Sequence, residues 1–185
     1  MTGSMATAII PRLMQSGLPN TIQPWKLAEQ GARLAGTFSL ACMPRLTSML
    51  ANTDAQVAVE LTADTDEEGI PYLEVHLETT ATAICQRCME ALALPLTAHS
   101  RLALLRGEAG ADTLPAAYDP LVVSGSNASL VEIVEDELIL ALPFSPRCAD
   151  PTVCQRTPAM PGPSKETPNH PFEALSVLLS ESKKE

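Results

Sequence analysis

The stretch Ile84-Cys85-Gln86-Arg87-Cys88-Met89-Glu90 lies near the middle of the chain, between two runs in which apolar residues alternate with other residue types. One run covers residues 73–77 and the other covers residues 92–96. An apolar residue at every second position is typical of a β-strand that buries one face. We therefore predict that this stretch is a turn between two strands, and that the other strands, one helix and the tails are arranged around it.

Further strands are predicted on both sides of this turn. Val57, Val59 and Leu61 alternate with polar or small residues, and a polar turn over residues 64–69 leads into a returning strand over residues 72–82. We expect these two strands to form an antiparallel hairpin with one face in water. Other strand signals cover residues 36–40, 92–105 and 121–123.

One long helix is predicted from Ser129 to Leu142. Ser129 and Glu132 form a capping-box pattern, in which the hydroxyl accepts a hydrogen bond from the third helical amide. Pro143 ends the helical pattern. The apolar arc of this helix consists of Leu130, Val131, Ile133, Val134, Leu138, Ile139 and Leu142.

These elements predict an α+β fold. A curved antiparallel sheet of about four strands, with curvature that approaches a small barrel, packs against the long helix, because one apolar sheet face and one apolar helix face must bury each other. A peripheral N-terminal helix starts at Pro24, since Pro fits the first helical turn, and Trp25 is its predicted core anchor. A second short helix covers residues 43–50, and an amphipathic C-terminal helix follows Pro171.

The chain is predicted to have four segments. Residues 1–17 form a flexible N-terminal extension, and residues 18–147 form a single α+β domain. Residues 148–169 are rich in Pro, Ser, Thr and charged residues, which is the composition of a linker. Residues 170–185 form a C-terminal amphipathic tail.

Composition narrows the function classes. The chain has 185 residues and a formal net charge of -10, and its 12 basic residues are scattered. Nucleic-acid binding usually rests on clustered Lys and Arg, so a broad phosphate-binding surface is not expected. No apolar stretch approaches the ~20 residues of a membrane span, and no secretory signal pattern is visible. In such a chain five cysteines favour reduced thiols or a metal over disulfides.

Cys85 and Cys88 have three interpretations that remain open. A zinc site needs two more ligands, which Cys148 and Cys154 could supply, although their spacing is loose for a zinc knuckle. A redox pair expects a long helix after the motif, whereas the following residues are strand-like and contain Pro95. Inert packing of two small residues is the default. We predict that the four cysteines lie on one side of the molecule, with zinc as the candidate cofactor.

Other polar residues do not form a catalytic pattern. His76 and His99 lie at outward or ambiguous strand positions without a partner motif, so solvated histidines are the simpler interpretation. Glu135, Asp136 and Glu137 are neighbours on a helix and point in different directions, which favours a solvated acidic face, or one matched to the helix dipole, over paired catalytic carboxylates. No nucleophile–base set, glycine-rich phosphate loop or zinc-protease motif is present, so an enzyme is not predicted.

Four pieces of sequence, taken in order, resemble a known family. They are Cys85-Gln86-Arg87-Cys88, Leu114-Pro-Ala-Ala-Tyr118-Asp-Pro120, Val134-Glu-Asp-Glu-Leu-Ile-Leu-Ala-Leu-Pro143 and Asn169-His-Pro171-Phe172-Glu-Ala-Leu175. Their order and spacing resemble the YceD family, the large ribosomal RNA subunit accumulation proteins of bacteria and plastids. The resemblance implies a cytoplasmic, non-catalytic factor needed for accumulation of large-subunit (23S) ribosomal RNA, and it supplies no catalytic residues.

The strongly acidic chain favours protein partners over RNA. We expect ribosome-assembly or RNA-processing proteins as partners, and no membrane. Glu132 and Glu135 on the helix are predicted to contact a basic partner, and Phe172, Leu175 and Leu179 of the tail are predicted to dock into a groove. The alternative function is a zinc-binding adaptor protein with no specific RNA role.

Overall fold

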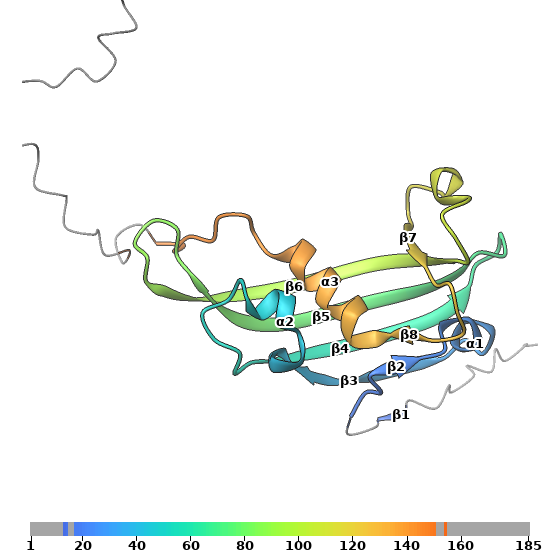
Figure 1. Ribbon diagram of the computed structural model, residues 1–185, viewed down its shortest axis with the longest axis horizontal. Coiled ribbons are helices and arrows are strands. Elements are labelled where there is room, and N and C mark those ends of the chain that lie inside the picture. The colour runs from blue at the N-terminus through green and yellow to red at the C-terminus, as the bar shows by residue number, and fades with distance from the viewer. Residues whose placement is uncertain (1–12, 15–16, 151–153, 155–185) are drawn as a thin grey trace, which may run out of the picture. The chain divides into compact units, whose positions relative to one another are not determined.

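Alternating apolar side chains build the centre of the sheet. β4 (Gln56–Thr65), β5 (Pro71–Ile84) and β6 (Ala91–Leu105) follow one another along the chain and pair antiparallel. The structure is a computed structural model that describes residues 13–14, 17–150 and 154 (Figure 1). Every second side chain of β4 from Val57 to Ala63 is buried, as predicted for a hairpin with one face in water.

Shorter strands extend this sheet on both sides, in the order β1-β3-β4-β5-β6-β7. β3 (Arg33–Ser39) pairs antiparallel with β4, whereas the edge strands β1 (Leu13–Met14) and β7 (Asp119–Val122) run parallel to β3 and β6. The predicted antiparallel sheet of about four strands is found in β3 to β6, and the structure adds a parallel strand at each edge. At the β7 edge the pairing is parallel because residues 106–118 carry the chain back before β7 starts. Within the described residues β1 and β7 do not pair with each other, so the sheet is open and is not a barrel.

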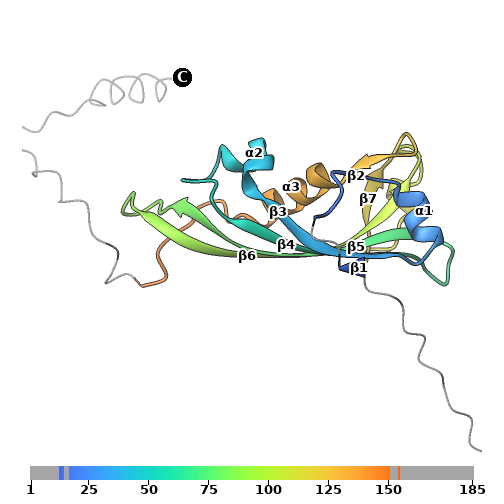
Figure 2. The ribbon, with the colours of Figure 1, turned by 90° about the horizontal axis from the view of Figure 1, so that it is seen from below.

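Helices cover one face of the sheet (Figure 2). They are α1 (Pro24–Glu29), α2 (Pro44–Thr47) and α3 (Leu130–Ala141), with short 3-10 turns at η1 (Leu40–Cys42) and η2 (Ala111–Thr113). A small second sheet pairs β2 (Thr21–Ile22) with β8 (Ala128–Ser129) just before α3. The largest fully buried side chains are Leu40, Met43, Leu46, Leu61, Leu73, Leu77, Leu130 and Leu138.

The ends of α3 follow from local sequence. The Ser129 hydroxyl accepts a hydrogen bond from the Glu132 amide at 3.3 Å, which is the predicted cap. Leu142 is extended before Pro143, so the helix ends there. With 12 residues, α3 is of ordinary length rather than long. Leu130, Ile133, Val134 and Leu138 of the predicted arc are buried, and Val131, Ile139 and Leu142 are partly buried.

The predicted α+β class is therefore correct, and the N-terminal helix starts at Pro24 as expected. Trp25 packs against the core while partly buried, and the Arg106 guanidinium lies 4.5 Å from the centre of its ring. No helix in the described part of the chain is long and apolar enough to cross a membrane. The predicted C-terminal tail, with Phe172, Leu175 and Leu179, lies outside the described residues.

Candidate metal centre

The predicted cysteine turn lies at the tip of the longest hairpin, between β5 and β6 (Figure 1). The Cys85 amide donates to the Glu90 carbonyl at 2.9 Å, and the Met89 amide donates to the Cys85 carbonyl at 2.9 Å. Met89 adopts a φ of 62°, in the left-handed region that lets a chain reverse direction tightly. This turn brings Cys85 and Cys88 together.

The second pair of cysteines reaches the same place after α3. The Gln86 amide donates to the Pro146 carbonyl at 2.8 Å, which holds the segment after α3 against the hairpin tip. The Cys148 amide then donates to the Cys85 sulfur at 3.4 Å. Residues 60 or more positions apart in the chain therefore share one site, and the prediction that the four cysteines lie on one side of the molecule is confirmed.

The four sulfurs have the spacing of a tetrahedral metal site. All four Sγ atoms lie within 4.8 Å of one another. The Cys85–Cys154 and Cys88–Cys148 sulfur distances are 3.9 Å and 3.8 Å. Four thiolates about 2.3 Å from a zinc ion form a tetrahedron with edges of about 3.8 Å. The residues present therefore fit a zinc ion, and these thiols are free rather than joined in disulfides.

The centre is a separate buried cluster. Cys85, Cys88 and Cys154 are buried, with Cys148 and Leu92 partly buried against them. The cysteines of this cluster differ in the pKa of their thiols. The amide of Cys88, together with that of Cys148, lowers the pKa of Cys85 to about 5 despite burial. The hydrogen bond with Cys85, together with burial, raises the pKa of Cys148 to about 12. Cys85 is therefore the more acidic of these two thiols, and a metal bound here would displace the remaining protons of the cluster.

Arg87 is part of the centre, although the sequence did not single it out. Its Nε donates to the Cys154 sulfur at 3.0 Å, and its Nη2 donates to the Cys148 carbonyl at 3.2 Å. The hydrogen bond to Cys154 raises the pKa of Arg87, so the guanidinium stays charged. Its position inside the C-x-x-C motif was the one feature of the sequence that could have pointed to this role.

The predicted solvated histidines lie on the open face of the sheet. His76 and His99 face each other across β5 and β6, with ring centres 6.0 Å apart. Their side chains are 45% and 60% exposed. Each Nε2 lies near a carboxylate, Glu78 for His76 at 3.2 Å and Glu74 for His99 at 3.3 Å. Glu78 lies on the same strand as His76, whereas Glu74 and His99 lie on neighbouring strands. These carboxylate neighbours were not expected from sequence, which showed no partner for either ring.

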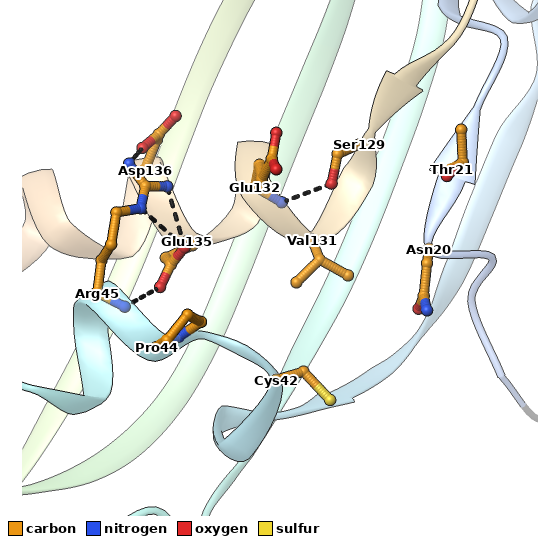
Figure 3. Close-up of a pocket in the computed structure, with 10 residues that line it drawn as sticks. All are labelled: Asn20, Thr21, Cys42, Pro44, Arg45, Ser129, Val131, Glu132, Glu135 and Asp136. Atoms are coloured by element: carbon orange, nitrogen blue, oxygen red, sulfur yellow. Dashed lines mark hydrogen bonds and ion pairs between the residues drawn. The ribbon is translucent and has the colours of Figure 1, made fainter.

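A cleft of about 690 Å³, lined mostly by polar residues, lies between α2 and the start of α3 (Figure 3). Glu135 is buried at its base, so the expectation that this carboxylate faces solvent is wrong. It accepts hydrogen bonds from the amides of Arg45 and Leu46, at 2.7 Å and 3.1 Å, and from the Arg45 side chain at 3.0 Å. Burial alone would raise the pKa of Glu135, but these hydrogen bonds outweigh it and lower the pKa. Glu135 therefore joins α3 to α2.

The neighbouring acidic residues remain accessible. Glu132 is exposed at the first turn of α3, and Asp136 lies 2.7 Å from Arg45 with over half of its side chain exposed. Of the two predicted partner contacts on the helix, Glu132 keeps a free surface position, and Glu135 has a structural partner instead.

An open sheet with helices on one face and four clustered cysteines at its longest hairpin defines a small α+β protein with a candidate tetrathiolate centre. The chain belongs to the YceD family, since residues 73–179 match the family model described as "Large ribosomal RNA subunit accumulation protein YceD". A protein of that name from Haemophilus influenzae is 28% identical over 130 residues, which cover 70% of this chain and 75% of the relative. No solved structure matches the chain.

Proposed function

We propose that this protein is a cytoplasmic, non-catalytic ribosome biogenesis factor that supports accumulation of large-subunit ribosomal RNA. The observation that carries the proposal is the family match over residues 73–179, which span most of β5, all of β6 and α3, and all four clustered cysteines. The name of the Haemophilus influenzae relative states the same role for that protein.

Protein partners suit this chain better than RNA. The net charge is -10, and few Lys or Arg are available to displace counterions from an RNA duplex. Ribosome-assembly and RNA-processing proteins with basic surfaces are the partners we propose. Exposed Glu132 on the body is one contact, and Phe172, Leu175 and Leu179 of the tail are the other, where they would dock into a partner's groove.

Zinc is the proposed cofactor of the four cysteines. When bound, it supplies a tetrahedral anchor for Cys85, Cys88, Cys148 and Cys154. The protein itself positions the ligands. The hairpin turn fixes Cys85 and Cys88, and the segment after α3 brings Cys148 and Cys154 to them. The site would then tie the chain at Cys148–Cys154 to the sheet. A zinc-binding adaptor without an RNA role is the second candidate function, which the same sulfur geometry favours.

A deletion strain separates these two functions. Loss of the protein is expected to lower 23S relative to 16S ribosomal RNA and to slow growth, and the full chain should restore both. Unchanged ribosomal RNA in the deletion strain would contradict the main proposal and favour the adaptor. Elemental analysis of protein purified without added metal tests zinc separately, with about one zinc per chain expected.

Truncation after Pro163 tests the tail. A truncated protein that folds normally but fails to restore ribosomal RNA would make the tail the working contact. Full restoration would assign the function to the α+β domain. Charge reversal by Glu132→Lys would then test the proposed partner contact on that domain. Charge reversal at Glu137, on the same helix, is its control.

A further inference from the structure

The two cysteine pairs are positioned by different means. Cys85 and Cys88 are three residues apart in a turn fixed by its own backbone hydrogen bonds. Cys148 and Cys154 are six residues apart, a spacing too long for a single tight turn to aim both sulfurs at one point. The Cys154 amide donates to the Asp150 carbonyl at 3.3 Å, within the same loop.

Arg87 reaches both ends of that longer loop. One guanidinium nitrogen donates to the Cys154 sulfur at 3.0 Å and another donates to the Cys148 carbonyl at 3.2 Å. The planar fork of an arginine can hold two acceptors in a fixed relation, which the single point charge of a lysine cannot. Four thiolates around a divalent ion also carry a net charge of about -2, which an adjacent cation offsets.

We propose that Arg87 is the positioning residue that completes the tetrathiolate centre, by holding Cys148 and Cys154 in place and by offsetting the thiolate charge. This inference rests on the zinc centre proposed above. Groups that contact metal ligands in this way, without binding the metal, typically change metal affinity 10- to 100-fold when removed. Arg87 lies on the surface of the turn, so its substitution should leave the fold intact.

The test compares the full-length protein with Arg87→Gln, Arg87→Lys and Arg147→Gln. Arg147 is exposed and adjacent to Cys148, so its substitution removes the same charge near the centre without touching the two hydrogen bonds. Zinc affinity is measured by competition with a chelator, and the tetrahedral thiolate site is followed by the absorption of bound Co²⁺. Far-UV circular dichroism verifies folding, and the alkylation rate of each cysteine by iodoacetamide is measured by mass spectrometry.

Arg87→Gln is expected to weaken zinc binding about 10- to 100-fold and to speed alkylation of Cys154 more than that of Cys85. Arg87→Lys keeps the positive charge but not the planar fork, so it should fall between Arg87→Gln and the wild type. Arg147→Gln should resemble the wild type. An affinity of Arg87→Lys equal to that of Arg87→Gln would overturn the charge-offsetting role. Equal affinity of Arg87→Gln and Arg147→Gln would overturn the inference while leaving the zinc centre intact. Wild-type affinity in Arg87→Lys would overturn the bridging role. A wild-type protein without a Co²⁺–thiolate band would overturn the zinc centre and this inference together.

Discussion

The molecule has two buried clusters that are held together differently. The main core lies between the sheet and its helices and consists almost wholly of Leu, Val, Ile, Ala, Met and Phe side chains. Among the described residues, the cysteine cluster at the β5–β6 tip buries Cys85, Cys88 and Cys154. Apolar burial stabilises by about 25 cal/mol per Å², so the first cluster can hold a domain and the second cannot. The hairpin tip therefore needs bonds of another kind, which the zinc ion proposed above would provide.

Leu138→Asp should break the main core. Leu138 is fully buried in α3, and an unpaired charge there costs several kcal/mol, on the order of the whole stability of a domain. Leu140→Asp is the control, because Leu140 is two residues along the same helix and 79% exposed. Thermal unfolding should show a folded control and an unfolded Leu138→Asp protein. Similar melting temperatures would show that α3 buries another face.

Glu135→Ala should cost about 2 to 3 kcal/mol, because two backbone amides and the Arg45 guanidinium lose their acceptor. Glu137→Ala, on the same helix, is the control and should change stability little. Urea unfolding measures both. An equal response of the two variants would mean that the Arg45–Glu135 contact contributes nothing to stability.

The same carboxylate makes stability depend on pH. The pKa of Glu135 in the folded protein is lowered from its ordinary value of 4.5. The stability that the ionised Glu135 carboxylate contributes is therefore fully present at pH values above 4.5. It is lost as the pH falls through the lowered pKa of the folded protein. The wild type should lose more stability on acidification than Glu135→Gln, as measured by urea unfolding between neutral and acidic pH. Parallel pH profiles would rule out this linkage.

Much of the main core was predictable because its signals are local. Alternation along β4 and β5, the Ser129 cap and the Pro143 stop each depend on residues a few positions apart, and each is found as predicted. The parallel pairing of β7 was not predictable, because it depends on the path of residues 106–118 between β6 and β7. Short edge strands carry little periodicity of their own.

The cysteine site was half predictable. The C-x-x-C turn is visible in the sequence, and its strand-like flanks correctly placed it between β5 and β6. The meeting with Cys148 and Cys154 depends on where α3 ends over the sheet, which no spacing rule states. The environment of Glu135 was predicted incorrectly. Its residue type suggested exposure to solvent, but Arg45, 90 residues away, supplies its hydrogen-bond partner.

Ser129→Ala should destabilise the main core by about 1 kcal/mol, the usual effect of removing a helix N-cap. The Glu132 amide loses its 3.3 Å hydrogen bond to the hydroxyl, while the buried side of α3 is unchanged. Ser126→Ala, at an exposed loop position, is the control. No difference between these variants in urea unfolding would show that burial alone fixes the start of α3.

Cys88→Ser should have the smallest effect on global stability and the largest effect at the hairpin tip. It removes one proposed zinc ligand from a cluster that, among the described residues, shares no buried residue with the main core. Hydrogen exchange should therefore quicken at the amides of Cys85 and Gln86, which donate to Glu90 and Pro146 across the site. Exchange of the amides in β4 should stay unchanged. A zinc chelator added to the wild type should reproduce this pattern.

Cys42→Ser is the matched control, because Cys42 is an exposed thiol in η1, away from the cluster. The Cys42→Ser variant should leave hydrogen exchange unchanged both at the hairpin tip and in β4. It should also respond to the chelator as the wild type does. If Cys88→Ser or the chelator instead unfolds β4 together with the tip, the two clusters form one cooperative unit. The thiolate centre would then stabilise the whole sheet, and the separation between an apolar core and a metal-tied hairpin would be wrong.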